Sequence, residues 1–136
     1  MYRNFTTLPM MCKLFEGIPS DKINNLFTQL SVRNVSLKKG EFLFKAGTKI
    51  TDFAVVISGQ LAISYYEANG HRNIVESLES METVAISLAV ADIQSVAISV
   101  EARQESEVIL FNANKVLNPV VKPSEEHIRL LRNITK

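Results

Sequence analysis

Short apolar segments separated by glycine turns fill the middle of this chain and most constrain its fold. Residues 53–57 form a compact, partly β-branched apolar run, which is typical of a buried strand. Residues 61–66 and 96–100 alternate in side-chain character with a period of two. Short strands spaced by glycine turns over about eighty residues predict an all-β sandwich or barrel. The expected turns are 38–40, 46–48, 58–59 and 69–70, the last an Asn-Gly hairpin signal in which both positions tolerate positive φ.

Helices are predicted on both sides of this β region. Apolar residues between 23 and 30 recur at spacings of three and four after a start signal at Ser20-Asp21. A short helical piece is expected around 115–117, ended by Pro119, and a final helix is expected to begin at Ser124 as its cap.

The final helix has an apolar stripe with no later segment of the sequence to cover it. Ile128, Leu131 and Ile134 lie on one stripe, with Leu130 beside it. The stripe packs either on its own domain or on a second copy of the chain. We favour the second copy, which makes Ile128, Leu131 and Ile134 candidate dimerisation residues.

Composition excludes several classes of protein. Fifteen Lys and Arg against fourteen Asp and Glu give a balance unlike that of a domain that binds nucleic acid by charge alone. Hydrophobic residues make up 46% of the chain, enough for a folded core rather than a disordered tail. Cys12 is the single cysteine, so neither an internal disulfide nor a cysteine cluster can form, which fits a reducing cytoplasm. No apolar run approaches the length of a membrane span.

Five short segments in a fixed order carry a family resemblance. They are residues 14–18, 38–47, 55–61, 69–72 and 106–111. Together they resemble the sensor domain of the Crp/Fnr family of bacterial transcription regulators. The resemblance implies a mainly β fold, the double-stranded β-helix or jelly roll of cyclic-nucleotide-binding-like domains, and a homodimer. It also implies three parts: helices in 1–30, the roll in 31–112, and helices in 113–136 that begin the dimerisation helix.

In this family a helix-turn-helix that reads DNA follows the dimerisation helix. No such pattern occurs in these 136 residues. We therefore expect a truncated regulator that reaches DNA only through a domain absent from this chain, with a stand-alone relative as the alternative.

The segment that binds a cyclic nucleotide in the family has lost its characteristic residues here. The family uses a Gly-Glu pair, followed about ten residues later by an Arg and a small hydroxyl residue, to hold phosphate and ribose. Ungapped alignment puts Ala85-Ile86 at the first place and Ser95-Val96 at the second. No Lys or Arg occurs between Arg72 and Arg103. A buried phosphate without a cation is unfavourable by several kcal/mol, so we predict that this domain does not bind cAMP or cGMP.

The roll could instead hold a small, non-nucleotide effector, or its side chains could simply fill it. The expected lining is mostly apolar, which suits a neutral or hydrophobic molecule. The candidate effector-binding residues are Glu82, Thr83, Val84, Ala85, Ile86, Ser95 and Val96.

No cofactor, metal or catalytic set is expected. Haem would need axial ligands, but His71 follows a turn and His127 is expected at the surface. Two distant histidines do not support a cupin-like metal enzyme or a hydrolase. The remaining alternatives are a sensor subunit of a kinase or channel, and an interaction or dimerisation module whose filled roll senses nothing.

Overall fold

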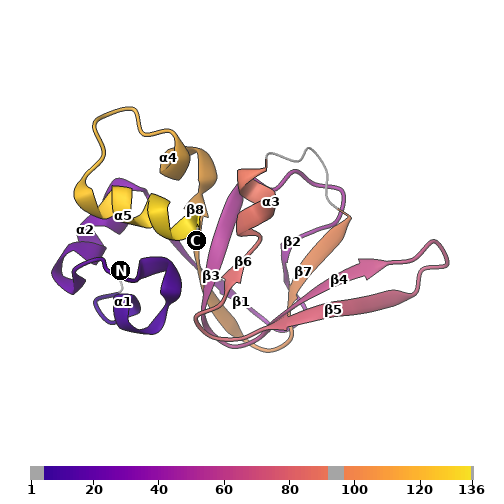
Figure 1. The fold of residues 1–136 in the computed structure, drawn as a ribbon. Coiled ribbons are helices and arrows are strands. Elements are labelled where there is room, and N and C mark those ends of the chain that lie inside the picture. The colour runs from indigo at the N-terminus through magenta and orange to yellow at the C-terminus, as the bar shows by residue number, and fades with distance from the viewer. Residues whose placement is uncertain (1–4, 92–96, 136) are drawn as a thin grey trace. The chain divides into compact units, whose positions relative to one another are not determined.

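The computed structural model describes residues 5–91 and 97–135, which form two units (Figure 1). We call Arg33–Leu110 the β-roll unit, and Met1–Val32 with Phe111–Lys136 the helical unit. None of the helices in the described ranges is long and apolar enough to cross a membrane.

Two four-stranded sheets make the roll, in the orders β1-β8-β3-β6 and β2-β7-β4-β5. The predicted mainly β, jelly-roll fold is confirmed. Strands β1 and β8, β3 and β6, and β4 with both β5 and β7 pair antiparallel. The bounds are β1 (Arg33–Leu37), β2 (Phe42–Phe44), β3 (Asp52–Ser58), β4 (Leu61–Tyr66), β5 (Arg72–Leu78), β6 (Thr83–Val84), β7 (Ile98–Ala102) and β8 (Ser106–Asn112).

Aliphatic side chains from both sheets form the core of the β-roll unit. Val56, Leu61, Val84, Val100 and Val108 are fully buried in one cluster. These residues come from five strands, because a period of two sends every second side chain of each strand inward. The alternation read from the sequence therefore describes the interior of the roll.

Two turns are set by backbone conformations that favour glycine. Gly59 has φ +94°, and a Cβ there would collide with Ser106, so only glycine fits at this position. At the hairpin between β4 and β5, only Gly70 has positive φ, whereas the Asn69 side chain accepts a hydrogen bond from the His71 N–H. The hydrogen bond from the Glu67 N–H to the His71 carbonyl closes this hairpin loop, which is therefore longer than the two-residue turn that the sequence suggested.

The helical unit contains short helices and one longer one. Lys13–Phe15 and Ser20–Lys22 are single 3₁₀ turns, so the helix expected to start at Ser20 becomes α-helical only at Ile23. The Ser124 side chain caps the last helix as expected, accepting from the His127 N–H at 3.2 Å. The helices are α1 (Leu8–Met11), α2 (Ile23–Gln29), α4 (Ala113–Leu117) and α5 (Glu125–Ile134).

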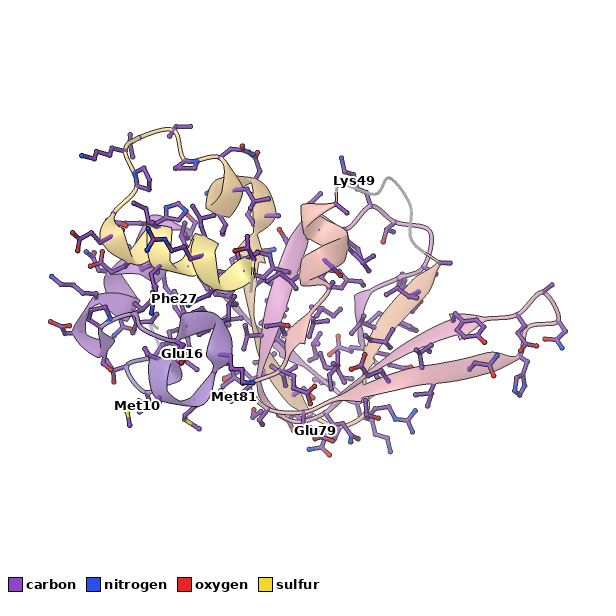
Figure 2. The ribbon with its side chains drawn as sticks, viewed as in Figure 1. Met10, Glu16, Phe27, Lys49, Glu79 and Met81 are labelled. Carbon is purple, nitrogen blue, oxygen red and sulfur yellow. The ribbon has the colours of Figure 1, made fainter. Side chains whose placement is uncertain are left out.

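Phenylalanine rings form the core of the helical unit. The fully buried ring of Phe27 (labelled in Figure 2) lies 5.2 Å from Phe5, 5.3 Å from Phe15 and 5.4 Å from Phe111, centroid to centroid. Helix α5 is attached to this core by Leu130, which is fully buried, and by Asn133. The Asn133 amide donates to the carbonyl oxygens of two residues around the first 3₁₀ turn, Leu14 and Glu16.

Candidate binding site in the β-roll

A tight turn leads into the segment that the sequence singled out. The Glu82 carboxylate accepts a hydrogen bond from the Glu79 N–H at 3.0 Å, and the Glu82 N–H donates to the Glu79 carbonyl. Met81, with φ 72°, donates its N–H to the Val56 carbonyl at 2.7 Å. Figure 2 labels Glu79 and Met81 in this turn before β6. The turn thus uses the Glu82 carboxylate to satisfy its own backbone.

The predicted site residues fall into three environments. Glu82 is exposed, whereas Thr83 and Ile86 are half-buried. Val84 is fully buried, stands opposite Ala54 of β3 and belongs to the core cluster, with Ala85 packed against it. Glu82 to Ile86 are contiguous and form one bend of the roll between β6 and the helix that follows it. The other two candidates, Ser95 and Val96, lie outside the described residues.

A short helix, α3 (Ile86–Val90), begins directly after this bend. Its first flanking residue, Ala85, has φ 63° and ψ 18°, a left-handed conformation that costs an L-residue with a Cβ about 1–2 kcal/mol. Ala85 therefore adopts a backbone conformation that favours glycine, although it carries a Cβ. No side chain caps this helix and its first turn carries no acid.

Arg72 is the basic residue closest in sequence to the bend at 83–86, and its side chain is already in an ion pair. The side chain of Arg72 on β5 forms an ion pair with Glu101 on β7, and both side chains are largely buried. Strand β4 lies between these two strands. The pair therefore spans β4 from one neighbouring strand to the other.

The strand register places the Arg72–Glu101 pair on the face of the sheet that points away from the core. Glu101 is opposite Ala62, whereas Val100, one residue earlier, is opposite Ile63 and packs with the core. A bulge between Ile63 and Ser64 then sets Arg72 in register with Tyr66 on the same outer face as Ser64. The guanidinium is thus directed away from the interior of the roll.

A buried hydroxyl lies within the same outer face. Ser64 is fully buried, and its Oγ has no hydrogen-bond partner among the residues the structure describes. Its neighbour across the strand, Ser99, accepts from the Ala46 N–H at 2.9 Å. Sequence patterns could not reveal this cluster, because it depends on a bulge between β4 and β5.

Other basic side chains of the roll unit are exposed or paired. Arg33 at the start of β1 bonds Asp52 at 2.9 Å with its own side chain 63% exposed. Lys45 lies over the Phe42 ring, with Nζ 5.4 Å from the centroid. The hairpin-tip residue Lys39 is exposed. In the described part of the roll unit, no basic side chain is buried in the aliphatic core.

Two residues of the helical unit have environments that bear on reactivity. His127 is 6% exposed, with Nε2 2.7 Å from the Val116 carbonyl oxygen, so the expected surface position is wrong. The cause is that α4 and α5 pack on each other across this bond.

Burial raises the pKa of the Cys12 thiol, although hydrogen bonds from the backbone of Leu14 and Phe15 act to lower it. A protonated, buried thiol is a packing group rather than a nucleophile. Within 5–91 and 97–135, no cluster of potential metal ligands occurs.

Comparison with known proteins gives the same fold. The model of the cyclic nucleotide-binding domain family matches residues 34–120. The sensor domain of the transcriptional regulator DNR from Pseudomonas aeruginosa is similar, with TM-score 0.72 and 22% identity over 96% of this chain and 78% of that one. The N-terminal domain of a transcriptional regulator from Streptomyces coelicolor A3(2) is similar at 0.72 and 19% identity, over 94% of this chain and 89% of that one.

Catabolite activator protein from Thermus thermophilus has TM-score 0.69 and 16% identity. The match covers 90% of this chain and 53% of that protein. This chain likewise spans 59% of the longer DNR structure. No curated protein matches the sequence.

Proposed function

The chain belongs to the cyclic nucleotide-binding domain family, and we propose that it is the effector-sensing and dimerisation domain of a Crp/Fnr-type transcription regulator that does not bind cAMP. The family match and the sensor-domain fold, both described above, support the regulatory class. The resemblance of five ordered segments to the Crp/Fnr sensor supports the same class.

One observation carries the part of the proposal that concerns cAMP. No Lys or Arg occurs from residue 73 to residue 102, and the guanidinium of Arg72 pairs with Glu101 on the outer face. A cyclic phosphate entering the roll would lose its hydration without gaining a fixed positive charge. The Glu82 carboxylate, already bound to the Glu79 N–H, is also a poor candidate to accept from a ribose hydroxyl.

A neutral effector remains compatible with the same bend. Thr83 supplies a hydroxyl, and the half-buried Ala85 and Ile86 supply apolar surface, whereas Val84 is fully buried in the core. A mostly apolar lining with one polar edge suits a small non-nucleotide molecule. Ser95 and Val96 remain predicted members of this site.

Helix α5 is the proposed dimer contact. Its buried face uses His127, Leu130 and Asn133, whereas Ile128 is 37% exposed and Leu131 and Ile134 are half-buried. A partly exposed apolar stripe beside a buried one suits a second copy of the same helix. The homodimer would present DNA-binding domains through a helix-turn-helix outside these residues, in the cytoplasm.

In this proposal regulation is a population shift. An effector that binds one arrangement of the dimer more tightly would favour that arrangement in proportion to the difference in affinity. The spacing of the DNA-binding domains would change with the pairing of the two α5 helices.

A second function has its own supporting observation. Val84 is part of the aliphatic core rather than the wall of an open cavity. A filled roll would make the domain an interaction or dimerisation module that keeps the family fold without sensing an effector.

Restoring the missing groups tests the cAMP part of the proposal. We expect the triple variant Ala85→Gly, Ile86→Glu and Ser95→Arg to bind labelled cAMP in equilibrium dialysis at least about tenfold more tightly than the parent. The double variant Ala85→Gly and Ile86→Glu, which keeps Ser95, is the matched control and should bind cAMP no more tightly than the parent. Micromolar binding by the parent would contradict the proposal.

Sedimentation equilibrium tests the dimer. Ile128→Glu places a charge in the proposed contact and should shift the parent dimer to monomer. Arg132→Glu changes an exposed residue of the same helix and should leave the dimer intact. A parent that sediments as a monomer at high concentration would instead favour a different role for α5.

A further inference from the structure

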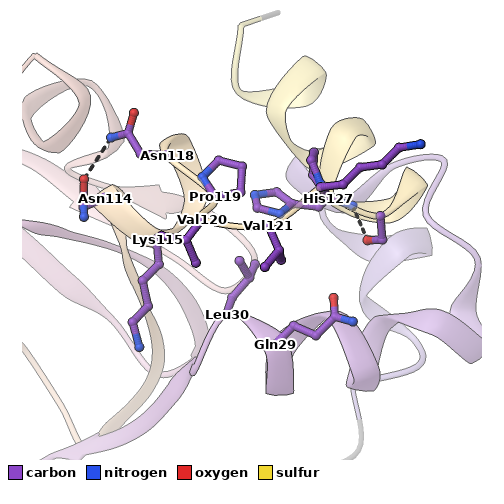
Figure 3. A pocket seen from close by; sticks show the side chains of 12 residues that line it. Gln29, Leu30, Asn114, Lys115, Asn118, Pro119, Val120, Val121 and His127 are labelled. Carbon is purple, nitrogen blue, oxygen red and sulfur yellow. Dashed lines mark hydrogen bonds between the residues drawn. The ribbon is translucent and has the colours of Figure 1, made fainter.

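The helical unit contains a cavity of about 630 Å³ that the proposed function does not use (Figure 3). Its walls come from the end of α2, from α4, from the connection 118–124 and from the first turn of α5. We call it the C-terminal groove. Its volume lies in the range of sites that bind small organic molecules.

Two prolines explain why this connection stays open. Helix α4 ends at Leu117, and Pro119 follows at a position where the ring cannot continue a helix. Pro123 precedes the Ser124 cap and holds the chain extended into α5. The chain between the two helices therefore runs as a non-helical rim, and the groove lies beneath it.

A buried histidine and an amide pair fix the frame of the groove. His127 Nε2 lies 2.7 Å from the Val116 carbonyl oxygen, so this nitrogen carries the proton and donates, which ties α5 to α4. The Asn118 amide donates to the Asn114 side-chain oxygen at 2.9 Å, as the dashed line in Figure 3 marks. The groove is thus formed before any ligand arrives.

The rim leaves apolar side chains in water. Val120 is 99% exposed and Val121 is 74% exposed, although both line the groove. Leu30, at the end of α2, adds a buried apolar wall. A guest with a hydrocarbon part would cover these surfaces.

The charge of the groove has one sign. Lys115 and Lys122 line it, both are exposed, and neither has an ion pair or hydrogen bond of its ammonium group with a residue in the described ranges. Among the residues that the structure describes, no Asp or Glu lines the groove. Two uncompensated ammonium groups beside apolar surface complement a molecule with a hydrocarbon body and one negative end.

We propose that the C-terminal groove binds a small amphipathic carboxylate, with its hydrocarbon part against Leu30, Val120 and Val121 and its carboxylate at the ammonium group of one of the two lysines, Lys115 or Lys122. This site is separate from the bend in the roll, and the proposal stands whether or not the roll binds an effector.

Octanoate and octanol form a matched pair of probes for this proposal. We expect octanoate to shift the methyl NMR signals of Val120 and Val121 in a saturable way, and to bind about tenfold more tightly than octanol. Rising salt should weaken octanoate binding and leave octanol unchanged.

Charge-removing variants show whether the lysines cause the preference. In the double variant Lys115→Gln and Lys122→Gln, the affinity for octanoate should fall about tenfold and come close to the affinity for octanol. Lys39→Gln, at an exposed turn of the roll unit, is the matched control and should change nothing. All these substitutions are at exposed positions, so an unchanged melting temperature should accompany each.

Three results would overturn the proposal. They are no saturable shift of the two valines with octanoate, equal affinity for octanol, or equal loss in the Lys39→Gln control. Self-association of the chain that covers Val120 and Val121, and that octanoate does not disturb, would assign the groove to a second copy and also overturn it.

Discussion

The bend in the roll and the C-terminal groove are built from similar apolar residues but differ in charge. The bend from Thr83 to Ile86 has no basic residue within ten positions on either side. The groove has two lysines whose ammonium groups have no partner in the described residues, and none of its described lining residues is an acid. The comparison teaches that two apolar regions of one chain can differ in the charge that their neighbouring residues bring to them.

The two regions also differ in how deeply their apolar residues are buried. Val84 of the bend is fully buried, whereas Val120 of the groove is 99% exposed. One is part of a core that holds two sheets together, and the other is available to a guest.

The largest expected effect separates these two valines with the same substitution. Val84→Asp buries a carboxylate without a partner and should lower the free energy of unfolding by about 3–5 kcal/mol. Val120→Asp should stay within about 0.5 kcal/mol of the parent. Urea unfolding followed by circular dichroism measures both. Similar losses for the two variants would break the distinction between core and rim.

A second effect tests whether the Arg72 guanidinium is held in its ion pair with Glu101. Glu101→Gln removes the partner of Arg72 inside a largely buried pair and should cost about 1–2 kcal/mol in unfolding free energy. Asp52→Asn breaks the Arg33 pair, whose guanidinium is mostly exposed, and should cost at most about 1 kcal/mol. Equal values would mean that Arg72 is free for other partners.

A third effect concerns the frame of the groove. Ser124→Ala removes the hydrogen bond to the His127 N–H and should lower stability by about 1 kcal/mol. It should also weaken octanoate binding, because the rim enters α5 at this cap. Ser36→Ala, at an exposed position of β1, is the control. A loss of stability with undiminished octanoate affinity would separate the cap from the groove.

The smallest effect tests the glycine-like geometry kept at the bend. Ala85→Gly should raise stability by about 0.5–1 kcal/mol, since glycine adopts φ 63° without the cost of a Cβ. Ala89→Gly, inside α3, should lower stability by about 1 kcal/mol. Thermal unfolding distinguishes the two signs. A destabilised Ala85→Gly variant would show that this backbone is not strained.

The roll could be predicted because its signals are local. Residues 61–66 and 96–100 showed a period of two, residues 53–57 showed a compact apolar run, and turns such as Gly59 and Gly70 required glycine at single positions. The final helix was likewise readable from its cap, Ser124, and from its apolar stripe. These features need no knowledge of which distant residues meet.

The misread features depend on long-range register or packing. The Arg72–Glu101 pair depends on a bulge in β4–β5 pairing, so sequence spacing alone could not place it. His127 is buried because its ring reaches the Val116 carbonyl across two helices. The C-terminal groove arises from how Pro119 and Pro123 route the chain, which the sequence signalled only as a helix break.

The central claim is that the roll offers no fixed positive charge to an anion. The most direct test is a titration of the ¹⁵N-labelled chain with cAMP to about 1 mM, following the backbone amides of Thr83 to Ala89 by NMR. The account predicts that these amide signals do not move. Saturable shifts of these amides with a Kd of about 10 μM or below would contradict it.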